Sequence, residues 1–218
     1  MSNNITTVGG QAFPMGVLMR GKRNAAAFKK ADGGIYVKTW DNQNGGQLPK
    51  TPVVRGLAAI GKAVIDGAST TAQLIKSGKE ADKKGPYITK LRKYHGAEHK
   101  TIACYEQGQE LTVENVKQHS RIHPRCGTSV AVTAVLAQSL MTAALPKSME
   151  PRKRENLELA AMVLAMGLSY ELNRKAWRGE SKLAEKLTAP GRWAQKLTTA
   201  EPDDEMISCA IAALEAAK

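Results

Sequence analysis

The chain has 218 residues, a formal net charge of +12 and three cysteines, and 42% of its residues are apolar. This length suits one good-sized domain with a small N-terminal attachment, and the odd, widely spaced cysteines argue against a disulfide framework and for a reducing compartment. The positive charge favours an anionic partner, which could be nucleic acid, an anionic membrane surface or a phosphorylated substrate.

The N-terminal segment, residues 9 to 40, is expected to form a small β element. Paired glycines at 9 and 10 precede an apolar run, and Gly33-Gly34 stands between two further strand-like segments, which is typical of a hairpin. Residues 41 to 50 are rich in Asn, Gly and Gln and are expected to form a linker. We therefore predict two parts: 1–50 as a β element with its linker, and 51–218 as a helical domain.

Apolar periodicity and helix-breaking residues predict helices over most of the remaining chain. Gly108 is expected to end the second helix, and Thr112 is a good N-cap for the third. Acidic residues at 201 to 205 stand at the start of the last helix, where negative charge is favoured, with Pro202 at its first position. The predicted fold is mainly α, a helical domain with a small N-terminal β-hairpin element (α+β). The expected helices are 54–75, 88–107, 113–121, 129–145, 156–176 and 202–217.

Residues 126 to 146 carry no charge, but Thr, Ser and Gln dilute their apolar character and basic residues flank both ends. A spanning helix usually shows a charge asymmetry, so we interpret this segment as a buried helix or a surface-dipping hairpin. We expect a cytoplasmic protein or one peripheral to the membrane.

The basic clusters lack interleaved aromatic residues and match no nucleic-acid module, so we read them as solvated helix faces or, failing that, a membrane or phosphate footprint. They are Lys83/Lys84, Lys90/Arg92/Lys93, Arg152/Lys153/Arg154 and Arg174/Lys175/Arg178.

All four histidines lie between residues 95 and 123, and the first two stand in the string His95-Gly96-Ala97-Glu98-His99. Positions four apart share one face of a helix, so two imidazoles could bind one divalent cation, most naturally zinc. Glu98 adds a carboxylate that could act as general base, and the order H-x-x-E-H is that of the inverted zincins. Gly96 is costly inside a helix, which suggests close approach of another backbone or a substrate. The alternative is a set of exposed, titrating side chains.

Further candidate ligands follow in the chain. His119, His123 and Cys126 could complete this site or form a second one, and Cys126 could instead be a nucleophile activated by a nearby histidine. Pro124 should force His123 out of helical conformation, so His119 and His123 do not form a helical pair. Glu171 is a candidate third ligand, or otherwise a glutamate in a salt bridge. Cys104 and Cys209 are expected to lie in the core.

Several strings resemble the bacterial YqhQ-like family. They are G-G-Q-A at 9–12, G-V-L-M-R-G at 16–21, Y-H-G-A-E-H-K at 94–100, C-Y-E at 104–106 and H-P-R-C-G-T-S at 123–129. The resemblance implies a predicted metal-dependent and usually membrane-associated protein, with no known substrate. The chain departs from this pattern at Met15, where the family generally has an acidic residue, and in its shorter, less hydrophobic apolar segments.

Two functions follow from these residues. In the first, the chain is a zinc-type hydrolase in which His95, His99, His123 and Glu171 supply metal ligands, Glu98 is the general base, and His119 or Cys126 assists. In the second, His and Cys ligands close a structural metal site in a non-catalytic, basic binding or assembly module at a membrane or ribonucleoprotein surface. A polar core network without metal is the third reading.

Overall fold

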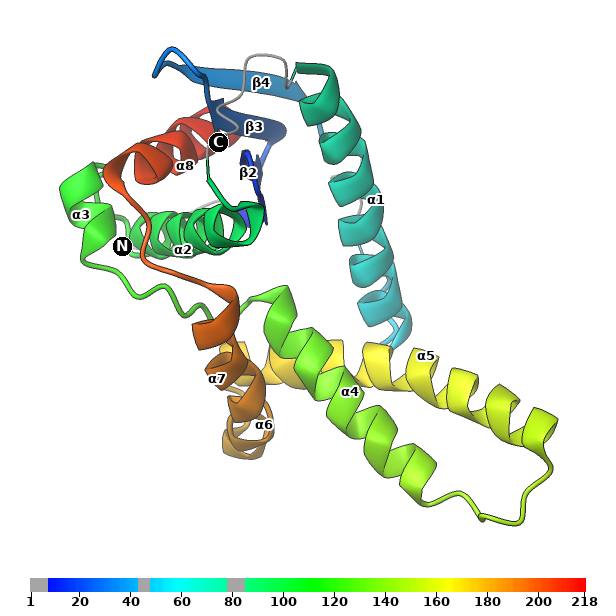
Figure 1. Ribbon diagram of the computed structural model, residues 1–218. Helices are drawn as coiled ribbons and strands as arrows, with labels where there is room; N and C mark the ends of the chain where they lie inside the picture. Colours follow the sequence, from blue (N-terminus) through cyan, green and yellow to red (C-terminus); the bar gives the residue numbers. More distant parts are fainter. Residues whose placement is uncertain (1–7, 43–47, 78–84) are drawn as a thin grey trace. The chain divides into compact units, whose positions relative to one another are not determined.

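The computed structural model describes residues 8–42, 48–77 and 85–218. The described parts of the chain are mostly helical with an N-terminal antiparallel sheet, which confirms the predicted α+β class (Figure 1). They group into two compact units: unit 1 takes residues 1–46, 65–123 and 196–218, and unit 2 takes 47–64 and 124–195. Part of the expected linker at 41–50 and the pair Lys83/Lys84 lie outside the described residues.

The sheet is a meander of four strands, where the sequence suggested only a hairpin. Each strand pairs with the next in antiparallel fashion, in the order β1-β2-β3-β4. Gly33, with φ of +89°, supplies the left-handed turn between β3 and β4 that its sequence context predicted. The strands are β1 Gly9–Phe13, β2 Gly16–Arg20, β3 Arg23–Lys29 and β4 Ile35–Asp41.

Both faces of the central strands are buried, because their residues alternate between two apolar clusters. Val17 and Met19 face the cluster that the sheet shares with helices α2 (Tyr87–Glu106) and α8 (Asp204–Ala217). Leu18 and Phe28 face the opposite cluster. Figure 1 shows α2 and α8 against the sheet in unit 1. The sheet thus shares its core with helices far along the chain, and the division at residue 50 stays a prediction.

Helix ends in unit 1 follow the expected capping chemistry. The Thr112 hydroxyl accepts a hydrogen bond from the Asn115 backbone N–H at 3.2 Å and begins α3 (Val113–Lys117), which is shorter than expected. Gly108 has φ of +69° just beyond α2. The last helix begins at Asp204, not at Pro202, because the Asp203 carboxylate accepts a bond from the Met206 N–H and fixes Asp203 as N-cap.

Helices α4 (Gly127–Ala143) and α5 (Pro151–Trp177) of unit 2 pack together as a hairpin (Figure 1). The uncharged segment is therefore not a buried helix, because Val135, Leu136 and Leu140 of α4 are exposed. Across the described ranges, every helix is too short or too polar to cross a membrane. Helix α1 (Val54–Ser77) was predicted, whereas α6 (Lys182–Leu187) and α7 (Ala189–Thr198) were not.

Candidate metal centre

His95 and His99 lie one turn apart on α2, and their ring centroids are 4.3 Å apart. This confirms the shared helical face expected from their spacing. Between them, Gly96 is buried, and a Cβ at this position would collide with the carbonyl oxygen of Ala200. The Ala200 N–H in turn donates to the Arg92 carbonyl oxygen at 2.8 Å. The glycine therefore admits a second backbone segment beside the histidines, as its cost in a helix suggested.

Each of these two imidazoles is oriented by a backbone carbonyl. Nδ1 of His99 lies 2.6 Å from the Arg121 carbonyl oxygen, and Nδ1 of His95 lies 3.0 Å from that of Thr198. Because a carbonyl oxygen only accepts hydrogen bonds, Nδ1 carries the proton and donates it in both rings. In the neutral ring this leaves the lone pair on Nε2, which is the arrangement found when a histidine binds a metal ion.

Burial keeps both rings neutral. It lowers the pKa of His99 to about 3, and the neighbouring His95 and His123 lower it further, against the opposing effect of the Arg121 carbonyl. Burial also lowers the pKa of His95, opposed by the Thr198 carbonyl. Both side chains therefore have the uncharged form that a metal ion requires at neutral pH.

Glu98 is buried between α2 and strand β1. One of its carboxylate oxygens lies 4.0 Å from Nε2 of His99, a distance that one water molecule can bridge. A Cβ at Gly10 of β1 would overlap the Glu98 carboxylate, so the strand leaves room for this side chain only because residue 10 is a glycine. The carboxylate is thus fixed beside the imidazoles, where it can accept a proton from a water molecule.

A thiol and a third imidazole complete the group. The possible ligand atoms of His95, His99 and Cys126 lie within 4.8 Å of one another. The ring of His123 is 5.5 Å from that of His99, and its Nε2 lies 3.2 Å from a carboxylate oxygen of Glu106. Two neutral imidazoles and a thiolate are ligands suited to zinc and other borderline-soft divalent ions.

Two predicted residues have other partners. His119 follows α3, because this helix ends at Lys117 and not at residue 121 as predicted, and its Nε2 lies 2.8 Å from the side-chain oxygen of Gln109. Glu171 lies on α5, and its two carboxylate oxygens accept hydrogen bonds from Arg55 at 2.8 and 2.5 Å. This is the salt bridge that the sequence offered as the alternative for Glu171. In the described parts of the chain the candidate metal group includes neither residue, and their roles in the site stay predictions.

The groups that orient the imidazoles were not predicted from the sequence. Thr198 and Arg121 act through backbone carbonyls, which every residue has, so no sequence signal marks them. Glu106 could have been found, because it follows His99 by seven residues and so lies on the same face of α2, two turns on.

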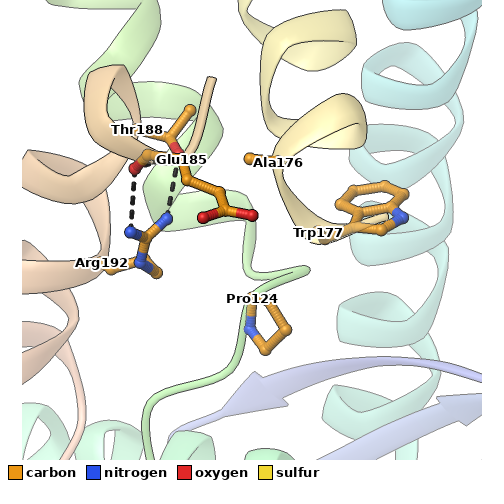
Figure 2. A pocket seen from close by; sticks show the side chains of 6 residues that line it. All are labelled: Pro124, Ala176, Trp177, Glu185, Thr188 and Arg192. Atoms are coloured by element: carbon orange, nitrogen blue, oxygen red, sulfur yellow. Dashed lines mark hydrogen bonds between the residues drawn. The ribbon is translucent and has the colours of Figure 1, made fainter. Parts of the chain in front are cut away.

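The pocket in Figure 2 belongs to unit 2 and has a volume of about 260 Å³. The Arg192 guanidinium there donates to the Thr188 hydroxyl at 3.0 Å and to the Glu185 carbonyl oxygen at 2.9 Å. None of the predicted site residues lines this pocket. The candidate metal centre is therefore the histidine group described above. The lining residues are Pro124, Ala176, Trp177, Glu185, Thr188 and Arg192.

The site defines the chain as a protein with a candidate His₂Cys metal centre in an α+β fold. The family described as protein of unknown function (DUF1385) matches residues 83–218, so the chain belongs to this family. It is 37% identical over 128 residues to the uncharacterized protein YqhQ of Bacillus subtilis (strain 168). That match covers 58% of this chain and only 40% of the relative. No solved structure matches the chain. The resemblance to the YqhQ-like family is thereby confirmed.

Proposed function

We propose that the protein is a metal-dependent hydrolase with a zinc-type ion at His95, His99 and Cys126. The observation that carries this proposal is the pair of neutral imidazoles, His99 buried and His95 half-buried, whose Nδ1 protons are held by backbone carbonyls. Surface histidines have no need of such fixed tautomers, whereas metal ligands are regularly oriented in this way.

The number of ligands favours catalysis. Catalytic zinc sites generally have three protein ligands and keep the fourth position for water or substrate. A divalent ion in this site would act as a Lewis acid on the substrate and lower the pKa of water. Glu98 is the proposed general base that accepts the proton of the attacking water. His123, held by Glu106, is the proposed proton donor to the leaving group.

A structural metal site is the second candidate, and the position of His123 favours it. If this ring turned from Glu106 toward the ion, His95, His99, His123 and Cys126 would form a closed site with four protein ligands. The protein would then be a binding or assembly module at a membrane or ribonucleoprotein surface. A role for His119 or Glu171 as metal ligand or catalytic group has less support in either function, because both side chains already have the hydrogen-bond partners described above.

Elemental analysis of the purified protein tests the metal. We expect about one equivalent of zinc, iron or manganese per chain, consistent with a single three-ligand group. The His95→Ala/His99→Ala double variant should lose it, and His119→Ala should retain it as the matched control. A folded wild-type protein that is metal-free and takes up no added zinc would contradict both functions.

Glu98→Gln separates the two functions. In the hydrolase this variant keeps its metal and its fold but loses turnover of the ester, amide or phosphate substrates that the wild type cleaves. X-ray absorption at the metal edge should show three protein ligands with one exchangeable oxygen ligand. Four protein ligands, together with an unchanged Glu98→Gln variant, would instead establish the structural site.

A further inference from the structure

The connection between α7 and α8, residues 199 to 203, forms neither helix nor strand and lies against α2. The Ala200 carbonyl oxygen fills the space beside Gly96, which is next to His95 in the chain. The last carbonyl groups of a helix are not used within the helix, so those at the end of α7 can bind neighbouring side chains. Nδ1 of His95 donates to one of them, the Thr198 carbonyl, at 3.0 Å. All of these residues belong to unit 1.

The Arg121 guanidinium binds this connection at several points. Its Nη1 donates to the Thr199 carbonyl oxygen at 2.7 Å and to the Thr199 hydroxyl at 2.9 Å. The same nitrogen lies 3.4 Å from the Lys196 carbonyl oxygen, and Nε lies 3.4 Å from a carboxylate oxygen of Glu201. Arg92 reaches the Thr199 carbonyl only at 3.4 Å. Because Thr199 is completely buried, its oxygens depend on protein donors, and Arg121 is the nearer of the two arginines.

Arg121 is thereby connected to both imidazoles, by two different routes. Its own carbonyl oxygen accepts the Nδ1 proton of His99 at 2.6 Å. Its guanidinium binds Thr199, and the residue immediately before it, Thr198, provides the carbonyl that accepts the Nδ1 proton of His95. We infer that Arg121 is a positioning residue of the metal centre, whose side chain holds the Thr198 carbonyl where it fixes the tautomer and orientation of His95.

The two routes respond differently to a change of side chain at residue 121. Any substitution keeps the backbone carbonyl and therefore the partner of His99. It removes the guanidinium, however, and with it the hydrogen bonds that hold the partner of His95. A general loss of stability would affect both rings alike, whereas loss of a positioning residue affects one of them. The inference rests on the proposed function for the role of the ion, but the orientation of His95 is a property of the metal-free chain.

The histidine tautomers of the chelator-treated full chain test this inference, and long-range proton–nitrogen NMR spectra distinguish protonation on Nδ1 from protonation on Nε2. In the wild type we expect the Nδ1–H form for both His95 and His99. In Arg121→Gln, His95 should become a mixture of the two forms while His99 does not change. Arg23→Gln is the matched control, since Arg23 is exposed, lies in the same unit and undergoes the same charge change. An unchanged His95 in Arg121→Gln, or an equal change in both rings, would overturn the inference.

Zinc titration measures the consequence for the ion. Loss of a group that orients a metal-binding histidine weakens affinity by roughly 10–100-fold, so Arg121→Gln should raise the zinc Kd at least tenfold while Arg23→Gln keeps the wild-type value. An unchanged Kd in Arg121→Gln would overturn the inference.

Arg121→Lys keeps the test decisive if Arg121→Gln does not fold. It retains the positive charge beside Glu201, but its ammonium cannot reproduce the fixed donors of the guanidinium, so His95 should again show both forms. Wild-type tautomers in Arg121→Lys would overturn the inference. If the wild type binds no zinc while the His95 tautomer still depends on Arg121, the proposed function fails and the positioning of His95 by Arg121 stands.

Discussion

Gly10 determines where the proposed base can lie, because a Cβ on this residue would overlap the Glu98 carboxylate. Gly10→Ala should therefore displace Glu98 and lower the hydrolytic rate at least tenfold, since general base catalysis contributes roughly 10²–10⁴-fold. Its metal content should not change, because His95, His99 and Cys126 are untouched. Crowding should also lower the free energy of unfolding by about 1–3 kcal/mol.

Gly9→Ala is the matched control for this prediction. A Cβ on Gly9 meets nothing within 4 Å among the described residues, so the variant should keep both its rate and its stability. Steady-state kinetics and thermal unfolding of the two variants provide the comparison. If Gly10→Ala and Gly9→Ala behave alike in both, Glu98 does not depend on this contact.

Cys209 is expected to make the free energy of unfolding depend on pH in alkaline solution. Burial raises the pKa of its thiol to about 11. The unfolded thiol releases its proton near pH 8.5, while the folded thiol holds it, so the unfolded state is favoured as pH rises from there toward 11. The free energy of unfolding should fall by about 2–3 kcal/mol over this range.

Denaturant unfolding at pH 8, 9, 10 and 11 measures this loss. In Cys209→Ala the decline should be shallower, and what remains includes the contribution of Tyr94, whose pKa is also raised by burial. Parallel pH profiles for the wild type and the variant would show that Cys209 makes no such contribution.

Only those residues of the site that lie on the same helix could be predicted from the sequence to lie close together. The spacing of His95 and His99 fixes a shared face by helix geometry alone, and this expectation was confirmed. Their orientation depends on the Arg121 and Thr198 carbonyls, which come from segments 22 and 103 residues away. Such backbone contacts leave no mark in the identity of the residue, so the tautomers could not be foreseen.

At the scale of elements, Asp203 joins the start of α8 to α2. Its carboxylate accepts the Met206 N–H at 3.0 Å and also forms an ion pair with Lys93 of α2 at 3.4 Å. Asp203→Ala should lower the free energy of unfolding by about 1 kcal/mol, the usual cost of losing an N-cap. Asp203→Asn should recover most of this loss, because its amide oxygen can cap the helix equally well. Chemical denaturation of both variants checks the prediction, which fails if Asn and Ala are equally destabilising.

Helix boundaries were predicted correctly where one residue at the boundary determines the backbone conformation or the hydrogen bonding there. Thr112 and Gly108 marked their helix ends correctly, because capping and positive φ are local properties. Helix α7 was not predicted, and it contains Pro190 and Gly191, two residue types that usually interrupt helices. Pro190 lies in its first turn, where its missing N–H costs nothing, and Gly191 packs against the backbone of Ser129. The second of these reasons is tertiary and cannot be read from the local sequence.

At the scale of the whole molecule, a bound ion would link segments that are far apart in the chain. His95 and His99 of α2 are already tied to the segments around Arg121 and Thr198. An ion that binds only the folded chain stabilises it by about 2.7 kcal/mol when its free concentration is a hundred times the Kd. For a chain of this size, each kcal/mol shifts Tm by roughly 2–4 °C. Removal of the metal with a chelator should therefore lower Tm by about 5–10 °C, and added zinc should restore it.

Differential scanning calorimetry of the wild type beside the His95→Ala/His99→Ala variant measures the effect. The double variant should unfold at one temperature with or without chelator, because it has lost the imidazoles through which the ion acts. An equal chelator shift in both proteins would place the stabilising ion elsewhere in the chain.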